Sequence, residues 1–293
     1  MLDSTPLAEA ERDHFDQQGY LIVRQALDPD AVARLLDAGD RLLASDLRTG
    51  RQQAADLRYD GFRNTIALDD AFIPLIDHER ILPTVVQLLG ADLHIMTSHL
   101  IHKLPDPADT PPTHRLPGWH RDYAMAMGDM GHRAIPRMLV KCAYYLTDLS
   151  EPSRGATMVA PGSHLLTEPP ARLDDGDPAG AIEPSLQPGD CLIFENRTFH
   201  AGGIHLGTDA RKAIMVGYGY RWVVPMDYRT QVPAFLHKLT PLQRFLVGEP
   251  YEEVAEFQVH GGRNPLQEWC EEHGFSVARH PQAQTQVQEA NSA

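Results

Sequence analysis

The feature that most constrains the fold is a series of short, apolar, strand-like segments in the middle of the chain, separated by turns that contain proline and glycine. Residues 93–103, 138–146, 191–194 and 211–222 have the apolar and β-branched composition that is typical of strands. Helical patterns lie on both sides of this series. This order predicts a mainly β protein with flanking helices, built as a double-sheet jelly roll or cupin-like barrel.

The flanking regions carry recognisable helix starts. A polar capping residue followed by proline marks three of them, and a glycine follows the end of two. Residues 48–64 contain loop-forming residues without a clear period, so we predict a loop there. The expected helices are 8–18, a helix that begins at Asp28-Pro29, 79–89, 240–248 and 264–274.

Length and charge disfavour several classes of protein. The 293 residues suffice for one large domain, expected over residues 1–280, and a disordered tail, residues 281–293, is poor in apolar side chains. A formal charge of −14 disfavours binding to nucleic acid or anionic membranes, and no run approaches the roughly 18 apolar residues of a membrane span. Three scattered cysteines and the lack of a signal-peptide pattern lead us to expect a cytoplasmic protein. The expected oligomeric state is a monomer or a homodimer.

A histidine and an aspartate two residues apart, His120 and Asp122, form the first part of a candidate metal site. Side chains alternate along an extended backbone, so both point to one side and can fill adjacent positions around a metal ion. His200, which follows a strand signal, offers a third ligand. Two histidines and one carboxylate leave open positions on the metal, which is the arrangement of non-haem Fe(II) oxygenases.

Arg211 begins the last strand-like run and indicates what the cavity binds. If Arg211 points inward, alternation places mostly small residues on its face, namely Ala213, Met215, Gly217 and Gly219. Glycine inside a strand often marks the close approach of a ligand or another backbone. A guanidinium binds a carboxylate through two parallel hydrogen bonds, so such a cavity suits a dicarboxylate. A surface arginine at a strand start is the alternative.

The order of these motifs resembles the phytanoyl-CoA dioxygenase (PhyH)-like family of Fe(II)- and 2-oxoglutarate-dependent oxygenases, which includes ectoine hydroxylase. The resemblance covers residues 11–222. Seven features occur in the family's order: Phe15 with Gly19-Tyr-Leu, Leu100-Ile-His-Lys103 with Pro105, His120-Arg-Asp122, Leu146-Thr-Asp148 with Gly155, Pro161-Gly-Ser-His164, Pro188-Gly-Asp190, and His200 with Arg211.

The resemblance implies a double-stranded β-helix that holds Fe(II), with 2-oxoglutarate and O2 as cosubstrates. His120, Asp122 and His200 match the iron ligands of the family. Arg211 matches the arginine that binds the distal carboxylate of 2-oxoglutarate. The implied reaction oxidises a C–H bond of a second substrate while 2-oxoglutarate becomes succinate and CO2.

Further positions match less uniform features of the family. Lys103 and His99 match residues that contact 2-oxoglutarate in some members, and alternation places both on one strand face. Thr97 and Tyr145 are the expected substrate contacts. Thr97 stands where ectoine hydroxylase has glutamine, so ectoine is not the expected substrate. Gly202 stands where members often have serine or threonine, so one hydrogen bond to the cosubstrate is either missing or supplied elsewhere.

The expected reaction is a hydroxylation, or a related oxidation such as desaturation or ring formation. Halogenating relatives have a small residue at the position of Asp122, which disfavours halogenation here. The expected substrate is a small molecule from amino-acid or natural-product metabolism. Two other classes stay open: a non-redox cupin-like isomerase or hydrolase with another divalent ion, and a barrel that only binds a metabolite.

Four segments are expected to form the pocket walls, because family members diverge there: 48–75, 104–118, 124–137 and 223–238. The side chains expected to add charge or aromatic surface to these walls are Arg121, Arg137, Tyr145, Arg221 and Trp222.

Overall fold

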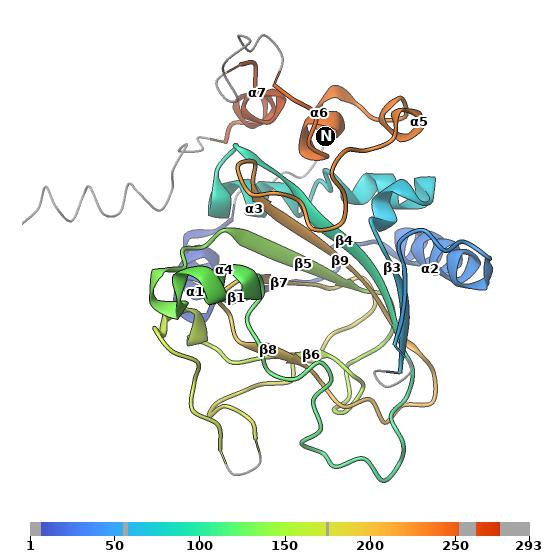
Figure 1. The fold of residues 1–293 in the computed structure, drawn as a ribbon, viewed down its shortest axis with the longest axis vertical. Coiled ribbons are helices and arrows are strands. Elements are labelled where there is room, and N and C mark those ends of the chain that lie inside the picture. Colours follow the sequence, from blue (N-terminus) through green and yellow to red (C-terminus); the bar gives the residue numbers. More distant parts are fainter. Residues whose placement is uncertain (1–6, 55–57, 174–175, 252–261, 276–293) are drawn as a thin grey trace, which may run out of the picture.

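The computed structural model describes residues 7–54, 58–173, 176–251 and 262–275, and the statements below refer to them. Its strands are β1 (Tyr20–Val23), β2 (Arg51–Ala54), β3 (Tyr59–Arg63), β4 (Leu93–Lys103), β5 (Leu139–Tyr145), β6 (Thr157–Val159), β7 (Cys191–Glu195), β8 (His200–Gly202) and β9 (Arg211–Tyr220). Seven of them form one antiparallel sheet in the order β1-β7-β5-β9-β4-β3-β2, and β6 pairs with β8 (Figure 1). The predicted mainly β, jelly-roll fold is confirmed.

The predicted capping residues begin their helices. Asp28 accepts a hydrogen bond from the Ala31 amide, and Thr240 and Asn264 cap in the same way, each followed by proline. One helix, residues 124–130, lies in a segment without a helical period. The helices are α1 (Glu9–Gln18), α2 (Pro29–Ala44), α3 (Leu82–Leu89), α4 (Ala124–Met130), α5 (Pro233–Leu236), α6 (Pro241–Leu246) and α7 (Pro265–Glu272).

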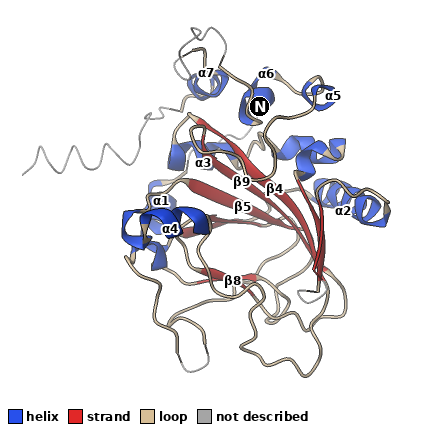
Figure 2. Cartoon of the chain, viewed as in Figure 1, coloured by secondary structure: helices blue, strands red, loops and turns tan. Residues whose placement is uncertain are grey.

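The two faces of the large sheet have different partners. Figure 2 shows α3 and α6 on one side of the sheet and β8 on the other. Along β9, Ile214, Val216 and Tyr218 join the core beneath the helices, whereas Arg211 and Met215 line a cavity on the opposite face. The alternation predicted for this strand is therefore confirmed, and it places the cavity between the two sheets.

The loop predicted for residues 48–64 is wrong. Strands β2 and β3 form an antiparallel hairpin that extends the sheet beyond β4. Across the hairpin, the Arg51 guanidinium pairs with the Asp60 carboxylate at 2.8 Å. The strands are polar because they form the edge of the sheet beside the cavity, so no apolar alternation reveals them.

Four predictions lie beyond these observations. Residues 281–293, predicted to be a disordered tail, lie outside the described residues, and the single domain over 1–280 stays a prediction. The cytoplasmic location and the monomeric or dimeric state also stay predictions. Within the described ranges, every helix is too short or too polar to cross a bilayer.

Candidate metal centre and its cavity

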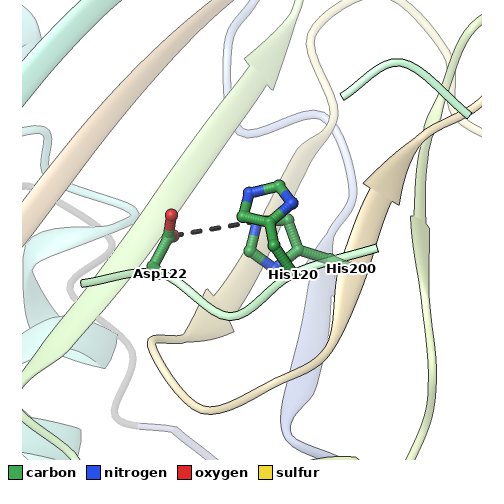
Figure 3. A group of neighbouring side chains, drawn as sticks. All are labelled: His120, Asp122 and His200. Atoms are coloured by element: carbon green, nitrogen blue, oxygen red, sulfur yellow. Dashed lines mark ion pairs between the residues drawn. The ribbon is translucent and has the colours of Figure 1, made fainter. Parts of the chain in front are cut away.

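The three predicted ligands converge in the cavity between the sheets (Figure 3). Their ligand atoms all lie within 4.8 Å of one another. The backbones of His120 and His200 exchange two hydrogen bonds of 2.9 Å, which hold the two histidines side by side. Asp122 follows two residues later, and its Oδ2 lies 3.9 Å from Nε2 of His200. Backbone pairing thus brings together residues that are far apart in the sequence.

Backbone carbonyl groups orient both imidazole rings. Nδ1 of His120 lies 2.7 Å from the Gly118 carbonyl oxygen, and Nδ1 of His200 lies 2.9 Å from that of Thr198. A carbonyl oxygen only accepts hydrogen bonds, so each Nδ1 carries a hydrogen and Nε2 is the ring nitrogen that is available to a metal. Burial lowers the pKa of His200 to about 3, so this ring is neutral, as a metal ligand must be.

The Asp122 carboxylate is ionised although it is buried. Burial alone would raise its pKa, but the Lys141 ammonium, 2.6 Å from Oδ2, lowers the pKa well below its usual range. Apart from this ion pair, Oδ2 has no hydrogen-bond partner among the described residues. The donor set of two imidazoles and one carboxylate fits a divalent metal ion.

Arg211 lies in the same cavity with only part of its guanidinium satisfied. Its Nε donates to the Gly155 carbonyl oxygen at 2.9 Å, and Cζ lies 5.7 Å from the centre of the Tyr145 ring. NH1 has no hydrogen-bond partner in the described part of the chain, although Arg211 is only 5% exposed. An unpaired buried donor costs about 1–3 kcal/mol, so the guanidinium is suited to an anionic ligand. The surface alternative for Arg211 is wrong.

The cavity has a volume of about 320 Å³, and some of the segments predicted to form its wall line it. Gln52, Tyr59 and Arg63 of the β2–β3 hairpin line it, as do Leu116 and Pro117. These residues belong to two of the four predicted wall segments. The described residues of the other two segments, 124–137 and 223–238, are absent from the lining.

Lys103 and His99 line the cavity, as their predicted strand face requires. The Lys103 ammonium donates to the Gly203 carbonyl oxygen at 2.7 Å and lies 3.3 Å from the Asp106 carboxylate. His99 contacts the hydroxyl of Tyr59 through Nε2. Burial lowers the pKa of both side chains. Both are therefore near the candidate cosubstrate site, and Lys103 already has an anionic partner.

Thr97 and Tyr145, the predicted substrate contacts, are not among the residues that line the cavity. Thr97 is buried beneath Arg63, whose NH1 donates to its Oγ1 at 3.1 Å. Tyr145 is fully buried, and its hydroxyl donates to Oγ1 of Thr157 at 2.7 Å. Strand alternation predicted the correct face for Thr97, but neighbouring side chains cover both residues.

Gly202 has a steric reason to be glycine. A Cβ at this position would lie 2.2 Å from the Leu116 carbonyl oxygen, so the loop before the first histidine occupies the space of a side chain. Thr157 pairs directly with Gly202 across β6 and β8, and Thr157 lines the cavity. A hydroxyl is therefore present opposite residue 202 instead of on it.

Sequence reasoning missed Lys141, which lines the cavity and contacts Asp122. Its strand, β5, was predicted, so an inward lysine on a mostly apolar strand was the available signal. It also misplaced Arg121 and Arg221, which bind backbone carbonyl groups away from the cavity, and Arg137, which pairs with Glu195. Trp222 is 58% exposed and also lies outside the lining.

A jelly roll that brings two histidines and a carboxylate to one point has the ligand arrangement of non-haem iron enzymes. The chain belongs to the phytanoyl-CoA dioxygenase (PhyH) family, whose sequence profile matches residues 15–213. The predicted family is confirmed, and with it the prediction of an enzyme of the iron- and 2-oxoglutarate-dependent dioxygenase class.

Similar proteins support this membership. The dioxygenase cdmD of Talaromyces verruculosus is 24% identical over 84% of each chain. Ectoine dioxygenase of Halomonas elongata is 26% identical over 84% of this chain and 78% of its own. The epimerase SnoN, solved with Fe3+, alpha ketoglutarate and nogalamycin RO, has a TM-score of 0.57 at 22% identity over 87% and 94% of the two chains. The carbocyclase SnoK from nogalamycin biosynthesis also scores 0.57, at 21% identity over 74% and 86%.

Proposed function

We propose that the protein is an Fe(II)- and 2-oxoglutarate-dependent dioxygenase that hydroxylates an unactivated C–H bond of a small metabolite and forms succinate and CO2. One observation carries this proposal: the ligand trio shares a single cavity with a buried arginine whose NH1 lacks a partner among the described residues. The two non-redox alternatives explain the trio, but neither needs a cationic pocket for a dicarboxylate.

The chain's own residues would bind and orient the reactants. Nε2 of His120, Nε2 of His200 and Oδ2 of Asp122 would hold the iron, which with 2-oxoglutarate supplies the oxidation by O2. Arg211 binds the distal carboxylate of 2-oxoglutarate through its unpaired NH1. Thr157, whose hydroxyl accepts a hydrogen bond from Tyr145, supplies the hydroxyl that residue 202 lacks.

The identity of Asp122 supports transfer of oxygen instead of a halide. A carboxylate ligand occupies the position that a halide would need on the metal. The relatives named as dioxygenases agree with this outcome, whereas the names of SnoN and SnoK show that the fold also carries epimerisation and ring formation. Mass spectrometry of products formed with chloride present separates the outcomes, because a chlorinated product would contradict hydroxylation.

Metal binding tests the ligand assignment directly. Anaerobic titration with Fe(II) should show about one site per chain, and His120→Ala or His200→Ala should weaken binding by at least about 100-fold, beyond the 10–100-fold effect of outer residues. The exposed His237 serves as the control, so His237→Ala should bind iron normally. Full iron binding in both ligand variants would refute the site.

Turnover tests the class of reaction. The protein with Fe(II), 2-oxoglutarate, ascorbate and a library of small metabolites should release succinate, and the stimulating metabolite should gain one oxygen atom. Release of succinate must depend on Fe(II) and O2. A metabolite converted without O2 or 2-oxoglutarate would instead favour the non-redox barrel.

A further inference from the structure

The cavity wall is cationic although the chain as a whole carries a formal charge of −14. Within the described lining, four side chains are cationic and one is a carboxylate: Arg63, Lys103, Lys141, Arg211 and Asp122. Two of the cations have anionic partners behind the wall. Lys103 lies 3.3 Å from Asp106, and Arg63 lies 3.8 Å from Asp227. Molecules or ions bound in the cavity must balance the charges of the other two, Lys141 and Arg211.

The charge of Lys141 remains unbalanced once the cavity is loaded as proposed above. The charges of Fe(II), Asp122, 2-oxoglutarate and Arg211 add up to zero. Lys141 has Asp122 as its anionic partner, but a metal ion would share the charge of this carboxylate. The Lys141 side chain is only 14% exposed, and a mostly buried ammonium is costly without an anion. One negative charge is therefore missing near Lys141.

The strand register places the cations at two separate ends of the cavity. Lys103 of β4 lies opposite Arg211 of β9 in the strand register, so these two residues mark one end. At the other end, Gly217 of β9 pairs with Thr97 of β4 on one side and with Lys141 of β5 on the other. From Arg211 to Gly217 the strand extends by about 20 Å, at roughly 3.4 Å per residue.

Arg63 reaches the same end as Lys141 from the β2–β3 hairpin. Its NH1 donates to Oγ1 of Thr97 at 3.1 Å, and its Nε donates to Gln52 at 3.1 Å. The described hydrogen bonds thus engage two of the three guanidinium nitrogens of Arg63. Between the two cationic ends, the lining contains the apolar side chains of Ile101 and Met215.

We propose that the primary substrate is a small organic acid whose carboxylate binds to Lys141 and Arg63, at the end of the cavity opposite Arg211. The inference rests on the proposed function and names the class of its substrate. An acid of this kind supplies the missing negative charge, and its hydrocarbon part contacts the apolar lining. The cavity of about 320 Å³ must hold 2-oxoglutarate as well, which restricts the acid to a small one.

Pairs of acids and amides test the substrate class. Protein loaded anaerobically with Fe(II) and 2-oxoglutarate is titrated with common amino acids and short fatty acids, each beside its primary amide. Binding is followed by the rise in melting temperature, and succinate release is then measured in air. Some acids should bind about tenfold more tightly than their amides, as a lost hydrogen bond to a charged group predicts. Amides that bind as well as the acids throughout would overturn the proposal.

Substitution of Lys141 tests the residue. Lys141→Met should abolish the preference for acids, and Lys141→Arg should retain most of it, because arginine keeps the positive charge. The affinity for 2-oxoglutarate should fall less in Lys141→Met than in Arg211→Ala. Lys238→Met is the matched control, since Lys238 lies on the surface paired with Asp70. Titration of 2-oxoglutarate, followed by the metal-to-ligand charge-transfer band, gives a readout other than turnover.

The outcomes separate this inference from the proposed function. If Lys141→Met weakens the binding of 2-oxoglutarate as much as Arg211→Ala does and leaves the preference for acids intact, Lys141 binds the cosubstrate, and the inference is wrong. If the unmodified protein binds no Fe(II) or 2-oxoglutarate, the proposed function itself is wrong.

Discussion

Two buried groups of charges in this protein differ in how completely their atoms are paired. In the Glu195 cluster, which consists of Glu195, Arg137, Arg197 and Asp16, Glu195 is fully buried and accepts from Arg137 at 2.5 Å and from Arg197 at 2.5 and 3.0 Å. Arg137 also pairs with Asp16 at 2.7 Å.

In the metal centre the pairing is incomplete. Oδ2 of Asp122 and NH1 of Arg211 lack hydrogen-bond partners among the described residues, whereas no atom of the Glu195 cluster does. A fully paired network stabilises the fold, and a partly paired one is held ready for a ligand at a cost in stability. Between these two groups the unpaired atoms lie in the metal centre, although eight other buried polar atoms without a described partner lie outside the cavity lining.

The largest expected effect comes from breaking the structural cluster. Glu195→Gln should lower the unfolding free energy of the metal-free protein by about 3–5 kcal/mol, because the buried Arg137 and the partly buried Arg197 lose their shared anion. Asp122→Asn should cost less, because it removes the anion from one ammonium, that of Lys141, instead of from two guanidinium groups. Denaturant unfolding of both variants measures the contrast. Equal losses of stability would mean that the two groups of charges do not differ as described.

A smaller effect should follow from removing the guanidinium of Arg211, whose NH1 has no described partner. Arg211→Ala should weaken 2-oxoglutarate binding by roughly 30-fold or more, because a desolvated charge pair is lost, while iron binding stays nearly unchanged. Arg211→Lys should restore only part of the affinity, since an ammonium cannot form the two parallel hydrogen bonds. Anaerobic titration of 2-oxoglutarate provides the measurement. An unaltered affinity would place the dicarboxylate elsewhere.

The smallest effect concerns a buried histidine away from the metal. Nε2 of His94 lies 2.9 Å from the Val223 carbonyl oxygen, and burial lowers the pKa of His94 to about 4. In the unfolded chain the pKa is about 6.5, so the unfolded state takes up the proton first as the pH falls. The contribution of His94 to stability is present above pH 6.5 and is lost between about pH 6.5 and 4, on the order of 1 kcal/mol for each unit by which burial lowers the pKa.

His94→Gln checks this window, because glutamine can donate to the same carbonyl group and does not titrate. Unfolding free energies of the metal-free proteins should converge as the pH falls from 6.5 to 4. If the variant keeps the full pH dependence, other groups are responsible for it.

Several features of the fold were predictable because they depend on local chemistry. Asp28, Thr240 and Asn264 each cap a helix whose first residue is proline, and both the cap and the fixed backbone angle of proline act within one turn. The hairpin β2–β3 was missed because its polar residues obtain their strand structure from pairing with β4. Residues 124–130 form a helix without one buried side chain, so they have no apolar period to recognise.

The sequence by itself determined the ligand types, their spacing and the inward face of β9, because side chains alternate along a strand whatever surrounds it. These properties led to His120, Asp122, His200 and Arg211, whose convergence the structure then showed. The functions assigned to these four residues stay proposals.

Only the tertiary structure decided which side chains meet across strands. Lys141 faces Asp122, Thr157 lies opposite Gly202, and Tyr145 lies behind Thr157 instead of beside a substrate. Each of these contacts depends on the register between strands that are distant in the sequence, and a shift of one residue would turn every side chain to the other face. No local pattern encodes that register, because long loops and the packing of two sheets set it.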